Sequence, residues 1–248
     1  MQSVRNHRME AEISMAKKVE MKKAVIFIVE GKSDKNALEH IFKVIYKHKN
    51  VTFEFTRGDV TSDETLTIDG IKSIIYEKVK AYMNEKKLNK NNIWQIVQIF
   101  DTDGTYIPEN AIVKGETDKF FYSTKEISCK DREKVIRRNK WKSETMDELL
   151  KLSDINGISY RCYFMSSNLD HALYNKLNLS DEEKELYSNK FYEMFVDHEK
   201  LFINFLESDV VNGCPDTFPA SWRYIKEELH SLERHTNLHI YFKENLYL

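Results

Sequence analysis

Short apolar runs that alternate with amphipathic segments place the strongest limit on how this chain can fold. The run Ala24–Val29 (AVIFIV) is apolar at every position, which is typical of a strand buried on both faces of a sheet. Residues 51–55 alternate between apolar and polar, while residues 93–100 (IWQIVQIF) and 158–164 (ISYRCYF) are largely apolar. These four segments are predicted to be strands.

Apolar residues recur at helical spacing between these runs. Leu38, Ile41 and Ile45 lie three or four positions apart, and Asp34 can cap the helix that they predict. Residues 67–87 predict a second, longer amphipathic helix. The order strand, helix, strand, helix, strand favours an α/β fold, in which right-handed crossovers build a parallel sheet flanked by helices.

The domain organisation follows from the same pattern. Gly (7) and Pro (3) are scarce, so no flexible linker marks a boundary. We expect an N-terminal extension over residues 1–23 and an α/β domain over residues 24–178. Residues 179–248 are expected to be a helical C-terminal region packed on the core, with helices over about 180–207 and 220–234.

The chain carries no sequence signal for export or membrane insertion. Residues 1–23 are polar and mixed in charge, and no apolar stretch is long enough to cross a bilayer. Cys129, Cys162 and Cys214 are widely spaced and form no CxxC pair, which argues against a disulfide framework and a structural zinc site. A cytoplasmic protein without membrane contact is therefore expected.

Carboxylates follow two of the predicted strands at the point where each strand ends. VIFIVE-GKSD supplies Glu30 and Asp34, and IVQIF-DTDG supplies Asp101 and Asp103. Because the carboxyl ends of parallel strands meet at one edge of a sheet, we expect these four side chains to share a pocket. Crowded carboxylates repel one another, and a hard divalent cation such as Mg²⁺ or Mn²⁺ neutralises them through oxygen ligands.

The spacing within each motif refines this expectation. Asp101 and Asp103 are two positions apart, so in extended backbone they share one face and Thr102 points away. Lys32, beside Gly31, can approach a phosphate. The simpler alternatives are that Asp34 is only a helix cap and that DTDG is an ordinary turn.

These ordered motifs resemble the Toprim family, which is shared by topoisomerases, bacterial primases, OLD-type nucleases and small stand-alone ribonucleases. The resemblance covers roughly residues 24–170: Glu30 matches the glutamate that closes the first core strand, and Asp101 and Asp103 match the later D-x-D. Asp34 matches a second acid that the nuclease branches commonly carry.

The resemblance implies a Rossmann-like Toprim sheet and a Mg²⁺- or Mn²⁺-dependent endonuclease. The short chain with scattered cysteines lacks the extra modules of a topoisomerase or primase. RNA such as tRNA is slightly favoured over DNA as substrate, and Glu30 would serve as metal ligand or as general base. Some small Toprim proteins are effectors of anti-phage defence, of the PARIS type, held by an ABC-type ATPase partner. That role, and a homo-oligomer, are further implications for this chain.

A basic segment follows the D-x-D motif. Residues 130–142 (KDREKVIRRNKWK) hold seven basic and two acidic side chains, a local balance of +5. Basic side chains here can follow a nucleic-acid backbone while the aromatic ring stacks on a base. The alternative is a solvated helix face with the tryptophan in the core. The candidate nucleic-acid contacts are Lys32, Arg137, Arg138, Lys140, Trp141 and Lys142.

A further acid follows the fourth predicted strand. Asp170, in the sequence MSSNLDHAL, can reach the same sheet edge as an additional metal ligand. The alternative is that this segment only starts a helix, capped by Ser167 or Asn168.

Two other functions remain open. FDTDGT and YFMSSN resemble motifs of the haloacid-dehalogenase phosphatases, in which Asp101 would be the nucleophile and Asp103 the general acid. In that family the nucleophile strand normally leads the fold, whereas here the unit ending in Glu30 precedes it. The other possibility is a non-catalytic interaction module that keeps a Toprim shell, although four crowded acids without a metal would destabilise it.

Overall fold

The computed structural model describes residues 24–46, 50–55, 59–210 and 213–245. The expected N-terminal extension, residues 1–23, lies outside these described residues. Among the described residues, every helix is too short or too polar to traverse a lipid bilayer.

The centre of the fold is a five-stranded, mostly parallel sheet with strand order β2-β1-β3-β8-β7. β1 pairs in parallel with β2 on one side and β3 on the other, and β3 pairs in parallel with β8. A hairpin adds β7 as the one antiparallel edge strand of this sheet. The strands span β1 Ala24–Val29, β2 Asn50–Phe55, β3 Ile93–Asp101, β7 Asp154–Ile155 and β8 Ile158–Met165. The predicted α/β class with a parallel sheet is therefore confirmed.

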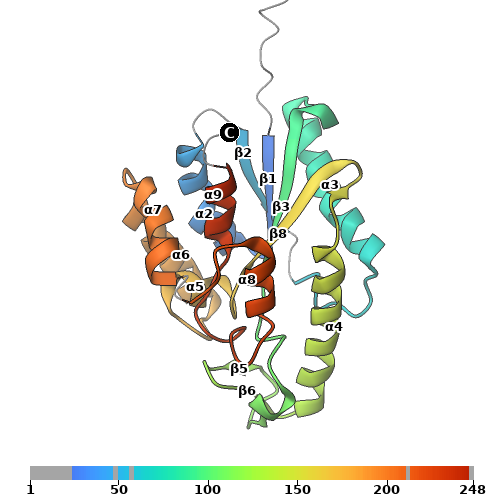
Figure 1. Cartoon of the computed structure of the whole chain (residues 1–248), viewed down its shortest axis with the longest axis vertical. Coiled ribbons are helices and arrows are strands. Elements are labelled where there is room, and N and C mark those ends of the chain that lie inside the picture. Colours follow the sequence, from blue (N-terminus) through green and yellow to red (C-terminus); the bar gives the residue numbers. More distant parts are fainter. Residues whose placement is uncertain (1–23, 47–49, 56–58, 211–212, 246–248) are drawn as a thin grey trace, which may run out of the picture.

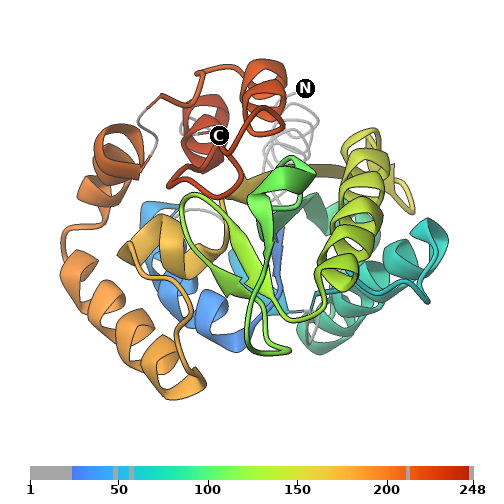
Figure 2. The same cartoon turned by 90° about the horizontal axis from the view of Figure 1, so that it is seen from below.

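Helices cover both faces of the sheet. Figure 2, which looks along the strands, shows α3 and α4 on one side, and α2 with the C-terminal helices on the other. The connection from β1 to β2 runs across the sheet in one direction, and the connection from β2 to β3 runs in the other. Because both crossovers are right-handed, their helices lie on opposite faces. These helices are α2 Lys32–Ile45, α3 Ile68–Lys86 and α4 Arg132–Leu150.

A small second sheet that the sequence pattern did not predict lies beyond the carboxyl ends of the strands. It has the order β4-β6-β5 and hangs below the main sheet in Figure 1. Gly104 joins it to β3 with a φ of +63°, and a Cβ there would lie 2.4 Å from Leu232. This close approach requires glycine. The elements are η2 Glu109–Ala111, β4 Ile112–Lys114, β5 Phe121–Tyr122 and β6 Ile127–Cys129.

The C-terminal region shares the hydrophobic core of the α/β domain. Phe27 of β1 stacks edge-on against Tyr241, with ring centroids 5.2 Å apart, and Phe42 of α2 packs on Phe242 at 4.9 Å. The Asn237 side chain accepts a hydrogen bond from the N–H of Phe164 on β8. The helices are α5 Leu169–Tyr174, α6 Asp181–Phe195, α7 Glu199–Phe205, the π-helical η3 Leu206–Val210, α8 Phe218–Tyr224 and α9 Leu238–Asn245.

Two helix predictions in this region were too long. The helix expected over 180–207 is interrupted after Phe195, and the helix expected over 220–234 stops at Tyr224. The His230 ring stacks on Tyr224 at 3.8 Å, and its Nδ1 lies 2.7 Å from the Tyr224 carbonyl oxygen. The imidazole and the Glu227 N–H thus share the Tyr224 carbonyl oxygen where the helix ends, and helical periodicity does not reveal this local contact.

Candidate metal centre

All four parallel strands deliver a carboxylate to one edge of the sheet. Asp59 follows β2, Glu30 follows β1, Asp101 and Asp103 end β3, and Asp170 lies just beyond β8. In the strand order β2-β1-β3-β8, Glu30 and Asp101 therefore come from the two central strands. This edge is where open α/β sheets place their ligands.

Glu30 is the centre of the carboxylate cluster. Its Oε1 accepts a long hydrogen bond, 3.4 Å, from the backbone N–H of Asp101. The same oxygen lies 3.7 Å from the Nζ of Lys142. Burial and the neighbouring charge of Asp59 raise the pKa of Glu30 well above its usual value. Its carboxylate is therefore poorly compensated by the protein alone.

Carboxylate oxygens of Glu30, Asp59 and Asp103 lie within 4.8 Å of one another, close enough to hold a metal ion. The ammonium group of Lys142, from α4, reaches into this set. Its Nζ lies 2.6 Å from Asp103 Oδ2 and 2.7 Å from Asp59 Oδ2. Burial alone would lower the pKa of Lys142, but Asp103, Asp59 and Glu30 together raise it well above its usual value. Lys142 is thus a charged side chain.

Asp59 is a member of the cluster that the sequence interpretation missed. It also caps its own turn, because Oδ1 accepts hydrogen bonds from the backbone N–H groups of Thr61 (2.9 Å) and Ser62 (3.1 Å). Burial acts to raise the pKa of Asp59. The charge of Lys142 and hydrogen bonds from the side chains of Lys142, Ser62 and Thr61 lower the pKa overall. The available signal was positional, since Asp59 is the first acid after the strand β2.

The other carboxylates face an open pocket of about 690 Å³. Asp101 Oδ1 accepts a 2.9 Å hydrogen bond from the N–H of Leu169, at the start of α5. Burial and the charge of Glu30 raise the pKa of Asp101 well above its usual value. The pocket is lined by Glu30, Gly31, Lys32, Ser33, Asp34, Asp101, Leu169, Asp170, Asp181 and Lys184.

Asp34 lies inside the first turn of α2, whereas the sequence placed it at the start. The helix begins at Lys32 with Gly31 as its N-cap residue, and Asp34 Oδ2 accepts a 2.9 Å hydrogen bond from the Gly31 N–H. Burial raises the pKa of the Asp34 carboxyl. The capping role and a place in the pocket therefore coexist at this residue.

Asp170 is a buried carboxylate with one oxygen that no described residue hydrogen-bonds. It is 5% exposed, and its Oδ1 has no hydrogen-bond partner among the described residues. Lys184 Nζ lies 3.9 Å from the other carboxylate oxygen, and burial raises the pKa of Asp170 to about 6. Helix α5 is capped by Asn168, whose side chain accepts a hydrogen bond from the His171 N–H. The cap therefore does not use Asp170.

Asp101 and Asp103 do not share a face, in contrast to the sequence expectation. Asp103 has a φ of 48°, so the backbone is not extended there, and its N–H donates a 2.5 Å hydrogen bond to the Ser167 carbonyl oxygen. Asp101 consequently faces the pocket and Asp103 faces Lys142. Glu30 lies between these two aspartates: it accepts a hydrogen bond from the Asp101 N–H and lies 3.7 Å from Lys142, the partner of Asp103.

The donor set limits the chemistry of this centre. It consists of carboxylate oxygens, which suit hard cations such as Mg²⁺ and Mn²⁺. No protein-family model matches this chain, and no curated protein or solved structure gives a significant match. The arrangement can bind a divalent cation next to a pocket that is open to solvent.

The basic residues predicted to contact nucleic acid are distributed over different environments. Lys142 is fully buried among the carboxylates, so its predicted place on a solvent-facing binding surface was wrong. Arg138 is also largely buried, with its guanidinium 3.7 Å from Asp103 Oδ2. The reason is that this face of α4 contacts Asp59 and Asp103, which follow β2 and β3, and a linear charge run does not reveal such contacts.

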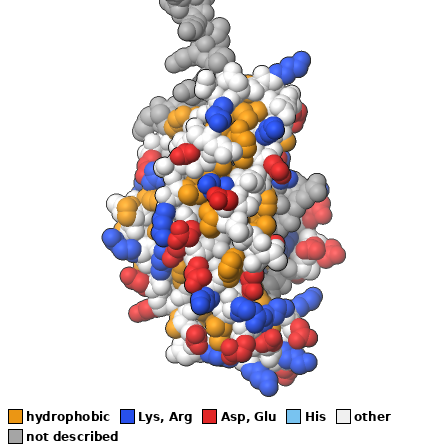
Figure 3. Space-filling view, turned by 90° about the vertical axis from the view of Figure 1, so that its right-hand side faces the viewer, with side chains coloured by type: hydrophobic (Ala, Val, Ile, Leu, Met, Phe, Trp, Pro, Cys, Tyr) orange, Lys and Arg blue, Asp and Glu red, His pale blue; other side chains and the backbone are white. Residues whose placement is uncertain are grey.

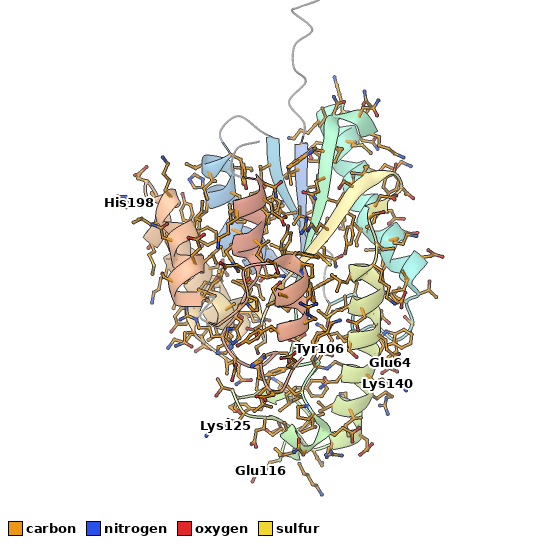
Figure 4. All side chains as sticks on the ribbon, viewed as in Figure 1. Glu64, Tyr106, Glu116, Lys125, Lys140 and His198 are labelled. Atoms are coloured by element: carbon orange, nitrogen blue, oxygen red, sulfur yellow. The ribbon has the colours of Figure 1, made fainter. Side chains whose placement is uncertain are left out.

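The remaining basic candidates are accessible. Arg137 is 62% exposed and pairs with Glu64 at 3.5 Å, and Lys140 is exposed on α4, where Figure 4 labels it. Trp141 is half-buried and donates a hydrogen bond from Nε1 to the Asp63 carbonyl oxygen. Acidic and basic side chains mix at the lower end of the face shown in Figure 3, so this surface is not uniformly basic.

Lys32, the predicted phosphate contact, lines the acidic pocket. Its side chain is exposed at the first position of α2 and lines the same pocket as Glu30 and Asp101. Lys184 of α6 lines the pocket as well. Two lysines therefore flank the carboxylates on the solvent side.

Proposed function

We propose that this protein is a metal-dependent endonuclease of the Toprim type. The observation that carries the proposal is the convergence of carboxylates from four adjacent parallel strands, with Glu30 between Asp101 and Asp103. A metal-dependent nuclease uses this kind of oxygen-rich centre, because a hard cation stabilises the charge that develops on the phosphate. The order of the motifs in the sequence, E-G-x-x-D before D-x-D, supports the same class.

Mg²⁺ or Mn²⁺ is the cation that we propose, and the residues fit it. Asp170 Oδ1 is buried and has no hydrogen-bond partner in the described part of the chain, which is the state expected of a ligand atom. Burial raises the pKa values of Glu30, Asp34 and Asp101, and neighbouring carboxylates raise those of Glu30 and Asp101 further. A divalent ion bound to the carboxylates that line this pocket would remove this penalty.

The chemistry divides between the ion and the protein. A bound divalent ion supplies Lewis-acid stabilisation of the phosphate and makes an attacking water more acidic. Lys32 and Lys184 line the pocket and would attract and orient the substrate phosphate. Glu30 would act as a ligand or accept a proton from the attacking water. The small sheet β4-β6-β5 lies at the same end of the molecule, beyond the strand ends, where it would limit the approach of a polymer (Figure 1).

The substrate and biological role that we propose come from the sequence resemblance. RNA, with tRNA as the first candidate, is favoured over DNA. The protein would act in the cytoplasm as an effector of anti-phage defence, alone or as a homo-oligomer, with an ABC-type ATPase as its partner. Arg137 and Lys140 are exposed on α4, the helix that also carries Lys142. They would contribute contacts to the nucleic-acid backbone.

The rival phosphatase activity has less support in the geometry. Ser166, the hydroxyl that the second phosphatase motif would offer to a phosphate, donates its hydrogen bond to the His230 carbonyl oxygen and is fully buried. The buried lysine contacts Asp103, whereas the rival mechanism uses Asp101 as its nucleophile. A non-catalytic module would leave the buried Asp170 oxygen without a role.

The deciding experiment compares cleavage of RNA and DNA in Mg²⁺, Mn²⁺ and EDTA, with p-nitrophenyl phosphate tested in parallel. Cation-dependent cleavage by the wild type that is lost in Glu30→Gln is the expected result. Glu85→Gln, a change of the same type at an exposed site at the end of α3, is the matched control and should retain activity. Phosphatase turnover lost in Asp101→Asn would replace the proposal with its rival, and inertness in every arm would favour the non-catalytic module.

A further inference from the structure

A lysine ammonium group lies inside the carboxylate cluster at the position of a cation. Lys142 Nζ is within 2.7 Å of one oxygen from Asp59 and one from Asp103, and 3.7 Å from Glu30 Oε1. These are the same three residues whose carboxylates are close enough to hold a metal ion. The Lys142 side chain has no exposed surface. It is therefore a fixed part of the centre, in contrast to a mobile surface charge.

The pocket side of the cluster has no such internal cation. Asp34 and Asp101 form no ion pair with a lysine or arginine among the described residues, and both satisfy one oxygen with a backbone N–H. Asp170 has one orphaned buried oxygen, and its nearest cation is Lys184 at 3.9 Å. This side is also the one that opens to solvent. The cluster thus has a compensated half and an uncompensated half, with Glu30 between them.

We propose that Lys142 is a built-in counter-cation that takes the place of a second metal ion, so that this centre binds a single divalent ion on its pocket side. The compensated half is Glu30, Asp59, Asp103 and Lys142, and the ion-binding half is Glu30, Asp34, Asp101 and Asp170. The inference rests on the proposed function for the presence of a metal. It goes further by fixing the number of ions and the residues that hold them.

Electrostatics supports this division. A divalent ion placed among Glu30, Asp59 and Asp103 would have to displace an ammonium that already has two short contacts with them, and the displaced charge would remain buried nearby. An ion on the pocket side displaces no protein cation and gains an unused ligand atom from Asp170. Two-metal nucleases place ions about 3.5 to 4 Å apart. In the proposed arrangement, the Lys142 ammonium takes the place of the second ion.

The test is a count of bound Mn²⁺ ions on the full-length protein without nucleic acid, by equilibrium dialysis and by electron paramagnetic resonance of free Mn²⁺. Wild type should bind one ion per chain. Lys142→Met keeps an unbranched side chain one atom shorter but removes its charge, and it should bind two. Lys140→Met, the same change at an exposed site on the same helix, should still bind one. Two ions in wild type, or one in Lys142→Met, would overturn the proposal.

Two further variants keep the proposal testable if Lys142→Met does not fold. Asp170→Asn should weaken the single ion's binding, whereas Asp59→Asn should retain one ion, because Asp59 belongs to the compensated half. Loss of the ion in Asp59→Asn, with retention in Asp170→Asn, would place the ion on the wrong side and refute the inference. A wild type that binds no divalent ion would refute the proposed function as well. A wild type that binds one ion but cuts no nucleic acid would refute only the nuclease.

Discussion

Lys142 Nζ lies 2.6 Å from Asp103 Oδ2, and this contact connects α4 to the end of β3 inside the acidic cluster. The same nitrogen lies 2.7 Å from Asp59, which follows a different strand. One helix residue therefore connects Asp59 and Asp103, which follow two different strands. A buried ammonium with two carboxylate partners is stable only while all three groups remain together.

Loss of the Lys142 charge should destabilise the protein. In Lys142→Met, Asp59 and Asp103 are left partly buried without their cation, and breaking a buried ion pair in this way typically lowers the free energy of unfolding by about 3–5 kcal/mol. Urea unfolding in EDTA measures the change. Lys140→Met should stay within about 0.5 kcal/mol of wild type, as expected of a surface substitution. Equal stability of the two variants would show that the buried contacts contribute little.

Without divalent ions, the free energy of unfolding should fall as the pH rises from about 4 to about 6. Glu30, Asp34, Asp101 and Asp170 all have folded-state pKa values raised above the unfolded values of about 3.9 to 4.3, and for Asp170 the value is about 6. The folded state thus keeps protons that the unfolded chain releases. The stability that these protons contribute is fully present below the unfolded pKa values and is lost as the pH rises through the folded-state pKa values.

The measurement is chemical denaturation across this pH range in EDTA and in saturating MgCl₂. Magnesium should flatten the fall, because it replaces the protons on the cluster. Asp59 acts in the opposite sense, since its lowered pKa makes its contribution disappear only as the pH falls below about 4. A free energy of unfolding that rises between pH 4 and 6 in EDTA would contradict the raised pKa values expected for these carboxyl groups.

Asp170→Asn should weaken divalent-ion binding without unfolding the protein. Removal of a carboxylate whose Oδ1 has no protein partner deprives the ion of a ligand, and an affinity loss of at least about tenfold is expected. At saturating Mn²⁺ this corresponds to about 1.4 kcal/mol less stabilisation, which appears as a smaller rise in Tm. Asp69→Asn changes an exposed acid at the start of α3, outside this pocket, and serves as control. Identical Mn²⁺ responses of the two variants would exclude Asp170 as a ligand.

Arg137→Ala should lower the salt dependence of nucleic-acid binding. Arg137 is 62% exposed, and each phosphate contact contributes about 0.7 to 0.9 to the slope of log affinity against log salt. Filter binding to a labelled RNA at several salt concentrations measures that slope. Lys151→Ala, an exposed cation at the other end of α4, should leave it unchanged. An unaltered slope in Arg137→Ala would remove this face of α4 from the binding surface.

The sequence alone determined the parallel sheet and the acids that end its central strands. Buried strands such as β1 have a local signature, and parallel strands place their carboxyl ends at one edge, so the sequence predicts that Glu30 and Asp101 are close if their strands are neighbours. The structure supplies that neighbour relation. The bounds predicted for the strand Ala24–Val29 agree with the structure, and those predicted for α3 differ from it by one residue at each end.

Tertiary structure alone decided which charges belong to the centre and how they are divided. Lys142 is one of seven basic residues in its segment, and only the packing of α4 across two loops distinguishes it from Lys140. Asp103 turns away from Asp101 because its N–H bonds to Ser167, 64 positions along the chain. Periodicity indicates which face of one helix or strand is buried. Which charged side chains come together in the site, and how deeply they are buried, is set by contacts between residues distant in sequence.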